Sequence, residues 1–396
     1  MSNSITLSAL ESALTGSAAA FRSITKLQPV GGEGDKVFPS TYAGGVYATE
    51  KRRLPGESDY VECVLLNSVQ SEANHAELAL RQAISRGEIH LPLIEADFTG
   101  CNHKFRKPVP NLTSLEVPHR LADAILRDCA LPDGVRFSQS DYARNWSRAN
   151  LWNATPIFEI CPTALVFGMW GSPDKPGGLG AKFERAYVSE IVAIDAIQNP
   201  KRAGFRIDPL ESSKNVLLKK TDDGFQLADP KAKGAIRPSE MNHGNIPYDT
   251  SNAGIRCRYA EQTTVVSLGA LRKLQFPISG KQSAGQDNAA RTVLAAIGLC
   301  AGVLAAERGT SLRSRCHLVP VETRVWRLVD IPGRPQTEFE VTAAQAVALL
   351  NEAVAAAKAA GLPWMEEMLT LTPTPELVQL IQQSQEVMAK EPGEGD

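Results

Sequence analysis

The sequence contains no uninterrupted apolar stretch of about 18 residues, the length that a membrane-spanning helix needs. Its first ten residues, MSNSITLSAL, have neither the basic start nor the apolar run of a signal peptide. We therefore expect a cytoplasmic protein without a membrane partner. The 396 residues are 43% apolar and 22% charged, which is typical of a globular chain of two or three domains, or of one domain with large insertions.

No Cys-x-x-Cys pair occurs among the seven cysteines, which are spread along the whole chain. This pattern favours reduced thiols over a disulfide framework. The nearest approach to a metal-ligand spacing is Cys101 with His103, and one such pair without a second is not typical of a zinc site. We predict no metal and no cofactor.

The sequence also lacks a recognisable catalytic motif. None of its six histidines lies in a G-x-S-x-G or H-E-x-x-H pattern. This absence favours binding over catalysis. The alternative enzymatic interpretation is a metal-independent ribonuclease that uses His75 or His243 as general acid or base.

The net charge of -2 conceals an asymmetry along the chain. Residues 201–285 carry 14 basic and 8 acidic side chains, whereas residues 338–396 carry 2 basic and 10 acidic ones. A basic middle followed by an acidic end suggests an anionic ligand or a head-to-tail contact between copies. A solvated surface is the alternative explanation.

The first half of the chain predicts a strand and a long helix. Residues 21–30 alternate apolar and polar side chains, as a half-buried strand does. Residues 59–86 predict a helix, with Asp59 and Glu62 as a capping box and Gly87 as its stop. An uncharged polar face of this helix suggests hydrogen bonds either to a ligand or to a neighbouring backbone. The residues of this face are Asn67, Gln70, Ser71, Asn74 and His75.

A glycine-rich loop lies between a predicted strand and a predicted helix. Residues 157–170 predict a core strand, bulged or broken at Pro162, and residues 182–196 predict a helix. A helix that begins after such a loop offers unpaired N–H groups to a phosphate, and Lys182 and Arg185 lie nearby in the sequence. The loop matches neither G-x-G-x-x-G nor a P-loop, which disfavours a mononucleotide-binding enzyme. A simple tight turn is the remaining alternative.

Residues 90–150 read as an insertion with few long periodic elements. Basic and aromatic side chains alternate at residues 103–107 and again at 144–148, with Trp152 close behind. Such clusters can hold phosphates while stacking bases, although a surface loop pinned by one buried tryptophan explains each of them as well.

The second half predicts further strands and helices. Residues 217–227 indicate a hairpin that projects from the body, because Asp223-Gly224 lies between apolar stretches. Strands are predicted at 263–268, 313–319 and 324–329, and arginines on the second could grip phosphate. Helices are predicted at 287–308, 342–360 and 375–389, and a disordered tail at 391–396.

Five segments together strongly resemble one family. They are LNSVQSEAN (66–74), FGMWGS (167–172), GGLGAKFERAYVSEI (177–191), GAIRPS (234–239) and RYAEQTT (258–264). The family is the RAMP-superfamily (Cas-seven-type) backbone subunit of type I-G, formerly I-U, CRISPR Cascade complexes. The resemblance covers about residues 15–335.

The resemblance implies an α+β fold with an RRM-like (ferredoxin-like) palm, fingers and a thumb. The palm would comprise residues 15–89, 151–198 and 259–335, the fingers 90–150 and the thumb 199–258. A C-terminal helical segment, 336–390, would precede the tail at 391–396. Such a subunit is not an enzyme, and the ribonuclease alternative would be a metal-independent endoribonuclease that processes CRISPR RNA. It polymerises along the guide RNA (crRNA) of an antiviral surveillance complex and presents the bases for pairing with target DNA.

The implied partners are crRNA, target DNA, further copies of the chain, the repeat-handle-binding and large subunits, and a recruited helicase-nuclease. The residues expected to contact RNA are polar, basic or glycine residues within or near the matching segments. They are Arg22, Lys26, Asn67, Gln70, Ser71, Asn74, His75, Gly177, Gly178, Gly180, Lys182, Arg185, Arg237, Asn242, His243, Arg256 and Arg258.

Overall fold

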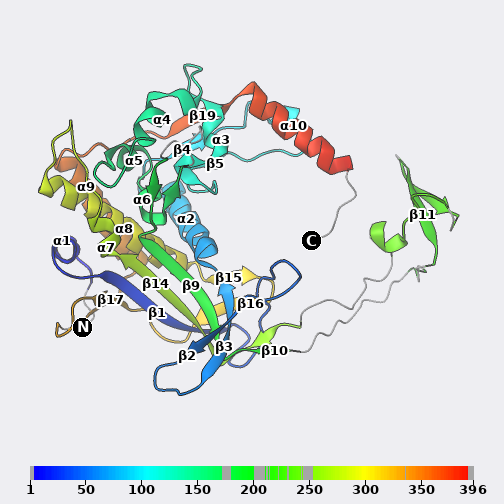
Figure 1. Ribbon diagram of the computed structural model, residues 1–396, viewed down its shortest axis with the longest axis horizontal. Helices are drawn as coiled ribbons and strands as arrows, with labels where there is room; N and C mark the ends of the chain where they lie inside the picture. Colours follow the sequence, from blue (N-terminus) through cyan, green and yellow to red (C-terminus); the bar gives the residue numbers. More distant parts are fainter. Residues whose placement is uncertain are drawn as a thin grey trace.

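A curled antiparallel sheet lies beneath the helices, in the lower part of Figure 1. The computed structural model describes residues 4–171, 180–199, 210, 213, 215–221, 223–229, 232–241, 243, 253–334 and 336–390. The strand order is β15-β16-β1-β14-β9-β3-β2, and β17 and β18 extend the edge beside β1. The strands are β1 (Ala20–Pro29), β2 (Thr49–Arg53), β3 (Tyr60–Asn67), β9 (Tyr187–Ile194), β14 (Tyr259–Ser267), β15 (Thr310–Arg313), β16 (Cys316–Pro320), β17 (Trp326–Val329) and β18 (Thr337–Phe339).

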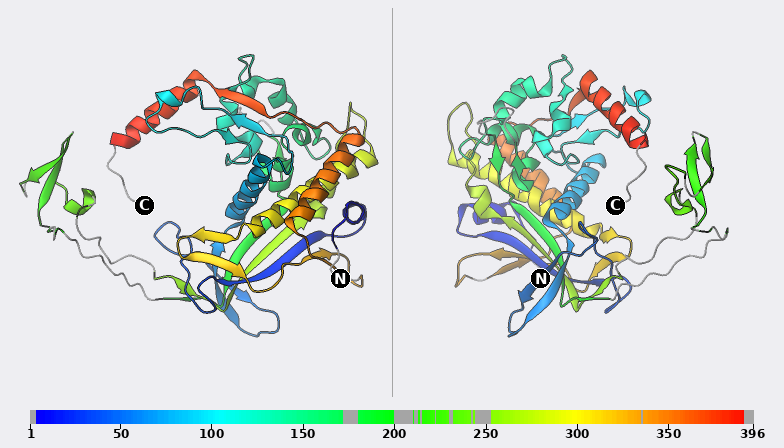
Figure 2. Two further views of the ribbon diagram at one scale, coloured as in Figure 1. Left: turned by 180° about the vertical axis from the view of Figure 1, so that it is seen from behind. Right: turned by 45° about the vertical axis from the view of Figure 1, so that its right-hand side comes forward.

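Helices cover one face of this sheet (Figure 2). The longest is α8 (Ala284–Glu307), which packs against α1 (Leu7–Thr15), α2 (Val69–Ser85), α7 (Leu268–Arg272) and α9 (Ala343–Ala359). α8 is long and apolar enough to cross a membrane by composition, but 78% of its most apolar window is buried inside the fold. It is therefore the core helix of an α+β protein whose sheet is consistent with an RRM-like palm.

The alternation predicted for the first strand is confirmed. In β1, Phe21 and Leu27 are buried on the inner face, while Arg22 and Lys26 lie on the outer face. β14 pairs with β1 and shows the same alternation over nine residues. The register therefore separates an inner, helix-covered face from an outer face.

The helix predicted over residues 59–86 is wrong in its first third. Residues 60–67 form β3, which pairs with β2 and β9, and α2 begins only at Val69. The actual cap is Ser68, whose hydroxyl accepts a hydrogen bond from the backbone N–H of Ser71. Gly87 follows the helix with φ 71°, as its predicted role as a stop requires.

The strand predicted over residues 157–170 is also wrong. The segment forms α5 (Thr155–Ile160), α6 (Thr163–Phe167) and the short strand β7 (Met169–Trp170). Pro162 does divide the segment, but it does so as the cap of α6. All five residues of α6 are buried, and a fully apolar run has no periodicity that distinguishes a buried helix from a buried strand.

The helix predicted over residues 182–196 is a pair of strands, β8 (Lys182–Phe183) and β9. Tyr187, Ile191 and Ala193 share the inner face, while Val192 and Ile194 belong to a separate cluster on the other face. Burial on both faces produced the apolar pattern that suggested a helix. An anion site at a helix N-terminus is therefore wrong at this position, and loop residues 172–179 lie outside the described residues.

The 90–150 segment consists of short elements, as expected. They are β4 (Ile94–Ala96), η1 (Asn102–Lys104), β5 (Leu112–Thr113), η2 (Arg120–Ala122), α3 (Ala124–Arg127), β6 (Cys129–Ala130), η3 (Phe137–Gln139) and α4 (Asp141–Trp146). A strand from far along the chain, β19 (Leu369–Pro373), lies between β4 and β6. The C-terminal segment is therefore not purely helical, since it contains β18 and β19 as well as α9 and α10 (Pro375–Lys390).

The remaining predictions are largely confirmed. The hairpin consists of β11 (Leu217–Thr221) and β12 (Gly224–Ala228), followed by η4 (Pro238–Met241), and Figure 1 shows this unit apart from the sheet and its helices. A pair of short strands, β10 (Ile197–Gln198) and β13 (Ile255–Arg256), follows β9 and precedes β14 in the chain, and β10 lies beside the end of the sheet near β3 (Figure 1). The strand predicted at 313–319 is instead divided between β15 and β16, because Arg315 has φ 58° in the turn between them. Residues 391–396 lie outside the described residues.

Candidate nucleic-acid interface

The polar face of α2 is exposed along part of the helix. Gln70 and Asn74 are exposed, and Ser71 and His75 are half-buried beside them. The opposite side of α2 is buried and contacts β9 and α8. These four side chains therefore form one surface, as the helical spacing predicted.

Asn67 does not belong to that surface, because it ends β3 and its side chain is buried. Its Nδ2 donates to Oε1 of Glu72, which is also buried. The other carboxylate oxygen of Glu72 accepts bonds from Oγ of Ser189 at 2.7 Å and from Nε2 of Gln262 at 2.6 Å. Nη2 of Arg324 then donates to Oε1 of Gln262 at 2.7 Å. Asn67 thus belongs to a buried network that joins α2 to the sheet.

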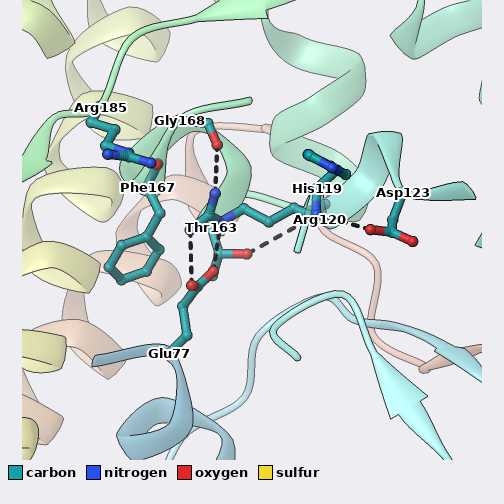
Figure 3. Close-up of polar contacts among 9 residues, drawn as sticks. Glu77, His119, Arg120, Asp123, Thr163, Phe167, Gly168 and Arg185 are labelled. Carbon is teal, nitrogen blue, oxygen red and sulfur yellow. Dashed lines mark hydrogen bonds and ion pairs between the residues drawn. The ribbon is translucent and has the colours of Figure 1, made fainter. Parts of the chain in front are cut away.

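A buried ion pair fixes the next turns of α2 (Figure 3). Glu77 accepts two bonds from Arg120, from Nε at 2.6 Å and from Nη2 at 2.8 Å. Nη1 of Arg120 donates to the carbonyl of Gly168 at 3.0 Å, and Arg120 itself has φ 51°. Burial raises the pKa of Glu77, while the neighbouring charges of Arg120 and Arg185 act in the opposite direction.

Arg185 anchors the other side of the same chain segment. Its Nε donates to the carbonyl of Phe167 at 3.2 Å, and its pKa is lowered by burial and by the nearby charge of Arg120. Gly168 has φ 83°, and a Cβ there would lie 2.7 Å from Cγ of Arg185. Only glycine fits this position, because a Cβ would clash with Arg185. The bond from Arg185 to Phe167 holds the residues before β7 and after β8 together.

The strands β7 and β8 pair as a small hairpin above this anchor. Lys182 is exposed on β8, and its Nζ lies 5.3 Å from the ring centroid of Trp170 on β7. Gly180 is half-buried just before β8, while Gly177 and Gly178 lie outside the described residues. Sequence reasoning overlooked Trp170, although its place in a short strand ahead of a glycine-rich loop could have indicated it.

Arg22 and Lys26 lie on the outer face of the sheet, away from α2. Arg22 lines a cavity of about 100 Å³ with Arg327 and Glu322, and Nζ of Lys26 lies 5.1 Å from the ring centroid of Tyr259. Because α2 covers the inner face, the predicted RNA contacts of the palm divide between two sides of the sheet.

The remaining predicted residues lie in the second half of the 199–258 segment. Arg237 is exposed before η4, and the His243 ring lies 5.6 Å from that of Phe225 on β12. His243 is 168 positions from His75 in the chain. Arg256 is exposed on β13, whereas Arg258 forms ion pairs with Glu57 and Asp195. Asn242 lies outside the described residues.

These features define an α+β protein with an RRM-like sheet, an uncharged helix face and a basic, tryptophan-bearing hairpin. Residues 22–198 match the family model of CRISPR-associated protein GSU0053. The matched segment contains most of β1, together with α2, the insertion, the β7–β8 hairpin and β9. No curated protein matches the chain. The family match supports a CRISPR-associated protein.

Proposed function

We propose that the chain is a crRNA-binding backbone subunit of a type I CRISPR surveillance complex, of the type I-G (formerly I-U) class. The observation that carries this proposal is the family match over residues 22–198, because that segment contains both the exposed face of α2 and the β7–β8 hairpin. The RRM-like sheet and the resemblance of segments outside the match, at 234–239 and 258–264, add support.

The proposed role is non-catalytic and rests on contacts to the RNA backbone. The amide and hydroxyl groups of Gln70, Ser71 and Asn74 can hydrogen-bond to sugar and phosphate, and Lys182 adds a positive charge. Such contacts do not read bases, as a guide that must pair with many targets requires. Target cleavage is assigned to a separate helicase-nuclease.

Several copies would stack head to tail along one guide in the cytoplasm, beside the repeat-handle-binding and large subunits. The acidic C-terminal segment and the basic 201–285 segment provide the opposite charges that such a contact needs.

The first test is to co-express the chain with a CRISPR array, purify it and size the RNA that survives nuclease treatment. We expect protected RNA of guide length, with footprints at a regular interval. A chain that emerges without RNA, even when its partner subunits are present, would contradict the proposal.

The second test reverses the charges of Lys182 and Arg237 together. RNA affinity should fall, and the slope of log affinity against log salt should become shallower by about 0.7 for each phosphate that the variant no longer binds. Lys358→Glu is the matched control, because Lys358 is an exposed lysine on α9 that is paired with Glu366. Unchanged slopes in the double variant would remove these two residues from the RNA surface.

A further inference from the structure

The outer face of the sheet carries two arginines that lie directly opposite each other. Arg22 on β1 pairs with Arg327 on β17 in the antiparallel register. Side chains in such a pair have Cβ atoms roughly 4.5–5.5 Å apart, and like charges placed this way destabilise a sheet. Among the described residues Arg22 has no ion-pair partner, while Arg327 donates through Nε to Oε1 of Glu338 at 2.7 Å. The pair therefore retains positive charge that an anion can neutralise.

The same two arginines line a cavity beside β1. Its volume is about 100 Å³, and the other lining residues are Ile24, Glu322, Thr323 and Val325. One water molecule needs roughly 10–15 Å³ of such space, so a tetrahedral phosphate fits the cavity. Glu322, Thr323 and Arg327 are exposed, so a ligand reaches the cavity from solvent.

A gap in the sheet produces this cavity. β1 pairs with β17 at its start and with β16 at its end, so residues 23–26 have no strand partner on that side within the described chain. There the carbonyl of Lys26 accepts a bond from the N–H of Val321 at 3.1 Å. Backbone groups of a strand point to alternate sides, so the N–H of Ile24 faces the same gap. The gap thus adds a backbone donor to the two guanidinium groups.

The loop that crosses the gap is held in place. Nη2 of Arg324 donates to Oε1 of Gln262, a buried residue on the inner face of β14, at 2.7 Å. Trp326, which begins β17, is 1% exposed. Thr323 and Val325, on either side of Arg324, line the cavity instead. The lining residues are therefore in place before a ligand arrives, which reduces the entropy lost on binding.

We propose that this cavity binds one phosphate of an RNA backbone, with Arg22 and Arg327 as the charged donors and Thr323 as a hydroxyl donor. Arginine suits this role because its planar group donates two parallel bonds to a phosphate. The identity of the ligand rests on the proposed function. The family resemblance pointed to Arg22 alone, whereas the cavity adds Arg327 and Thr323 and places the contact on the side of the sheet opposite α2.

The first test measures binding of fluorescent oligouridine to the full chain at several salt concentrations. We expect the double variant that combines Arg22→Gln and Arg327→Gln to bind about 10- to 100-fold more weakly, because charge-assisted hydrogen bonds are lost. The slope of log affinity against log salt should become shallower by about 0.7, the value for one phosphate. Arg86→Gln is the matched control, since Arg86 is an exposed arginine that pairs with Glu88. An equal loss in the control would overturn the site, because it would show a general effect of charge.

Glu322 provides a variant with the opposite expected effect. Its carboxylate lines the cavity and repels a phosphate there. Glu322→Gln should therefore strengthen RNA binding about 2- to 10-fold, whereas the double arginine variant weakens it. A purely structural role of the cavity does not predict opposite changes from neighbouring residues. Weaker binding by Glu322→Gln would overturn the phosphate site.

Free phosphate tests the cavity without RNA. At equal ionic strength, inorganic phosphate should raise the melting temperature of the wild type above its value in chloride by more than it does for the double arginine variant. General salt effects act on both proteins alike. Unchanged RNA affinity and slope in the double variant would overturn the RNA contact even if phosphate stabilises the wild type, and would leave the proposed function intact. No RNA binding by the wild-type chain, even with its partner subunits, would overturn both.

Discussion

Glu72 and Glu77 are two buried carboxyl groups on α2, and they are held in opposite ways. Glu72 accepts hydrogen bonds from neutral donors, the side chains of Asn67, Ser189 and Gln262. Glu77 forms a bidentate ion pair with Arg120. The first carboxyl joins α2 to the strands beneath it, and the second joins α2 to the 90–150 segment and to the base of the β7–β8 hairpin.

The difference shows how α2 is fixed to two different regions, the sheet and the 90–150 segment. Asn67 at the end of β3 is close to Glu72 in the chain, and Ser189 and Gln262 reach it from β9 and β14, which pair in the sheet. The insertion contributes only short elements, and a long arginine spans from η2 to both Glu77 and Gly168. The network at Glu72 is therefore distributed over several residues, whereas the contact at Glu77 depends on one side chain.

The largest effect is expected from Arg120→Met. This change leaves a buried carboxylate without its partner, which costs about 3–5 kcal/mol of unfolding free energy at neutral pH. Chemical denaturation of the variant and the wild type measures the difference. Glu77→Gln should cost less, because burial already favours the neutral form of this group. Equal stability of Arg120→Met and wild type would show that the ion pair does not anchor the hairpin.

The same variant should change the pH dependence of stability. The pKa of Glu77 is raised in the native state, so the folded chain keeps a proton that the unfolded chain loses above about pH 4.5. Stability from this group therefore declines as pH rises through that interval. Loss of Arg120 removes the largest opposing interaction, so the decline should continue to higher pH in the variant.

Glu72→Leu should have the second-largest effect. It leaves the buried donors of Ser189 and Gln262 without their acceptor, at a cost of about 1–3 kcal/mol. Glu72→Gln retains one acceptor oxygen and serves as the matched control. A larger loss here than in Arg120→Met would reverse the comparison between the two carboxyl groups.

Asn67→Ala tests one donor of the distributed network. Because Ser189 and Gln262 still hold Glu72, we expect a loss of about 0.5–1.5 kcal/mol in unfolding free energy. If stability is instead unchanged while RNA affinity falls, Asn67 contacts RNA as the sequence suggested and the buried network contributes little.

The smallest change in stability is expected for the double variant that combines Gln70→Ala and Asn74→Ala. Both side chains are exposed on α2, so unfolding free energy should stay within about 0.5 kcal/mol of the wild type. RNA affinity should fall all the same, as measured by polarisation of a labelled oligonucleotide. This pair separates the binding face of α2 from its two structural carboxyl groups, and unchanged affinity would remove the face from the RNA surface.

Strands whose apolar and polar residues alternate regularly were predictable from the sequence. Segments that are buried on both faces, such as β9, were not. The alternation of β1 and the stop of α8 before Gly309 needed only local patterns. Residues 182–196 failed because β9 is apolar on both faces. The pattern of Asp59 and Glu62 resembled a cap by chance, since both lie outside the real helix, which begins after Ser68.

The sequence predicted which residues share the exposed face of α2. It did not predict the buried contacts that hold α2 and the β7–β8 hairpin in place. The spacing of Gln70, Asn74 and His75 was enough to place them together once a helix was assumed. The pairing of Glu77 with Arg120 joins residues 43 positions apart, and no local signal indicates it. Exposure of Trp170 and burial of Trp146 likewise depend on which strands and helices meet in the folded chain.

The position of β19 bears on the order in which the chain can mature during synthesis. β19 lies between β4 and β6, and Thr374 bonds Asp128 across 246 residues. During synthesis, β4 and β6 are translated well before β19. Until β19 is made, the edges of β4 and β6 that face each other remain unpaired. Open strand edges attract other chains. A truncated chain that ends before residue 369 lacks β19. We therefore expect its sheet to form, while its 90–150 segment aggregates through the open edges of β4 and β6.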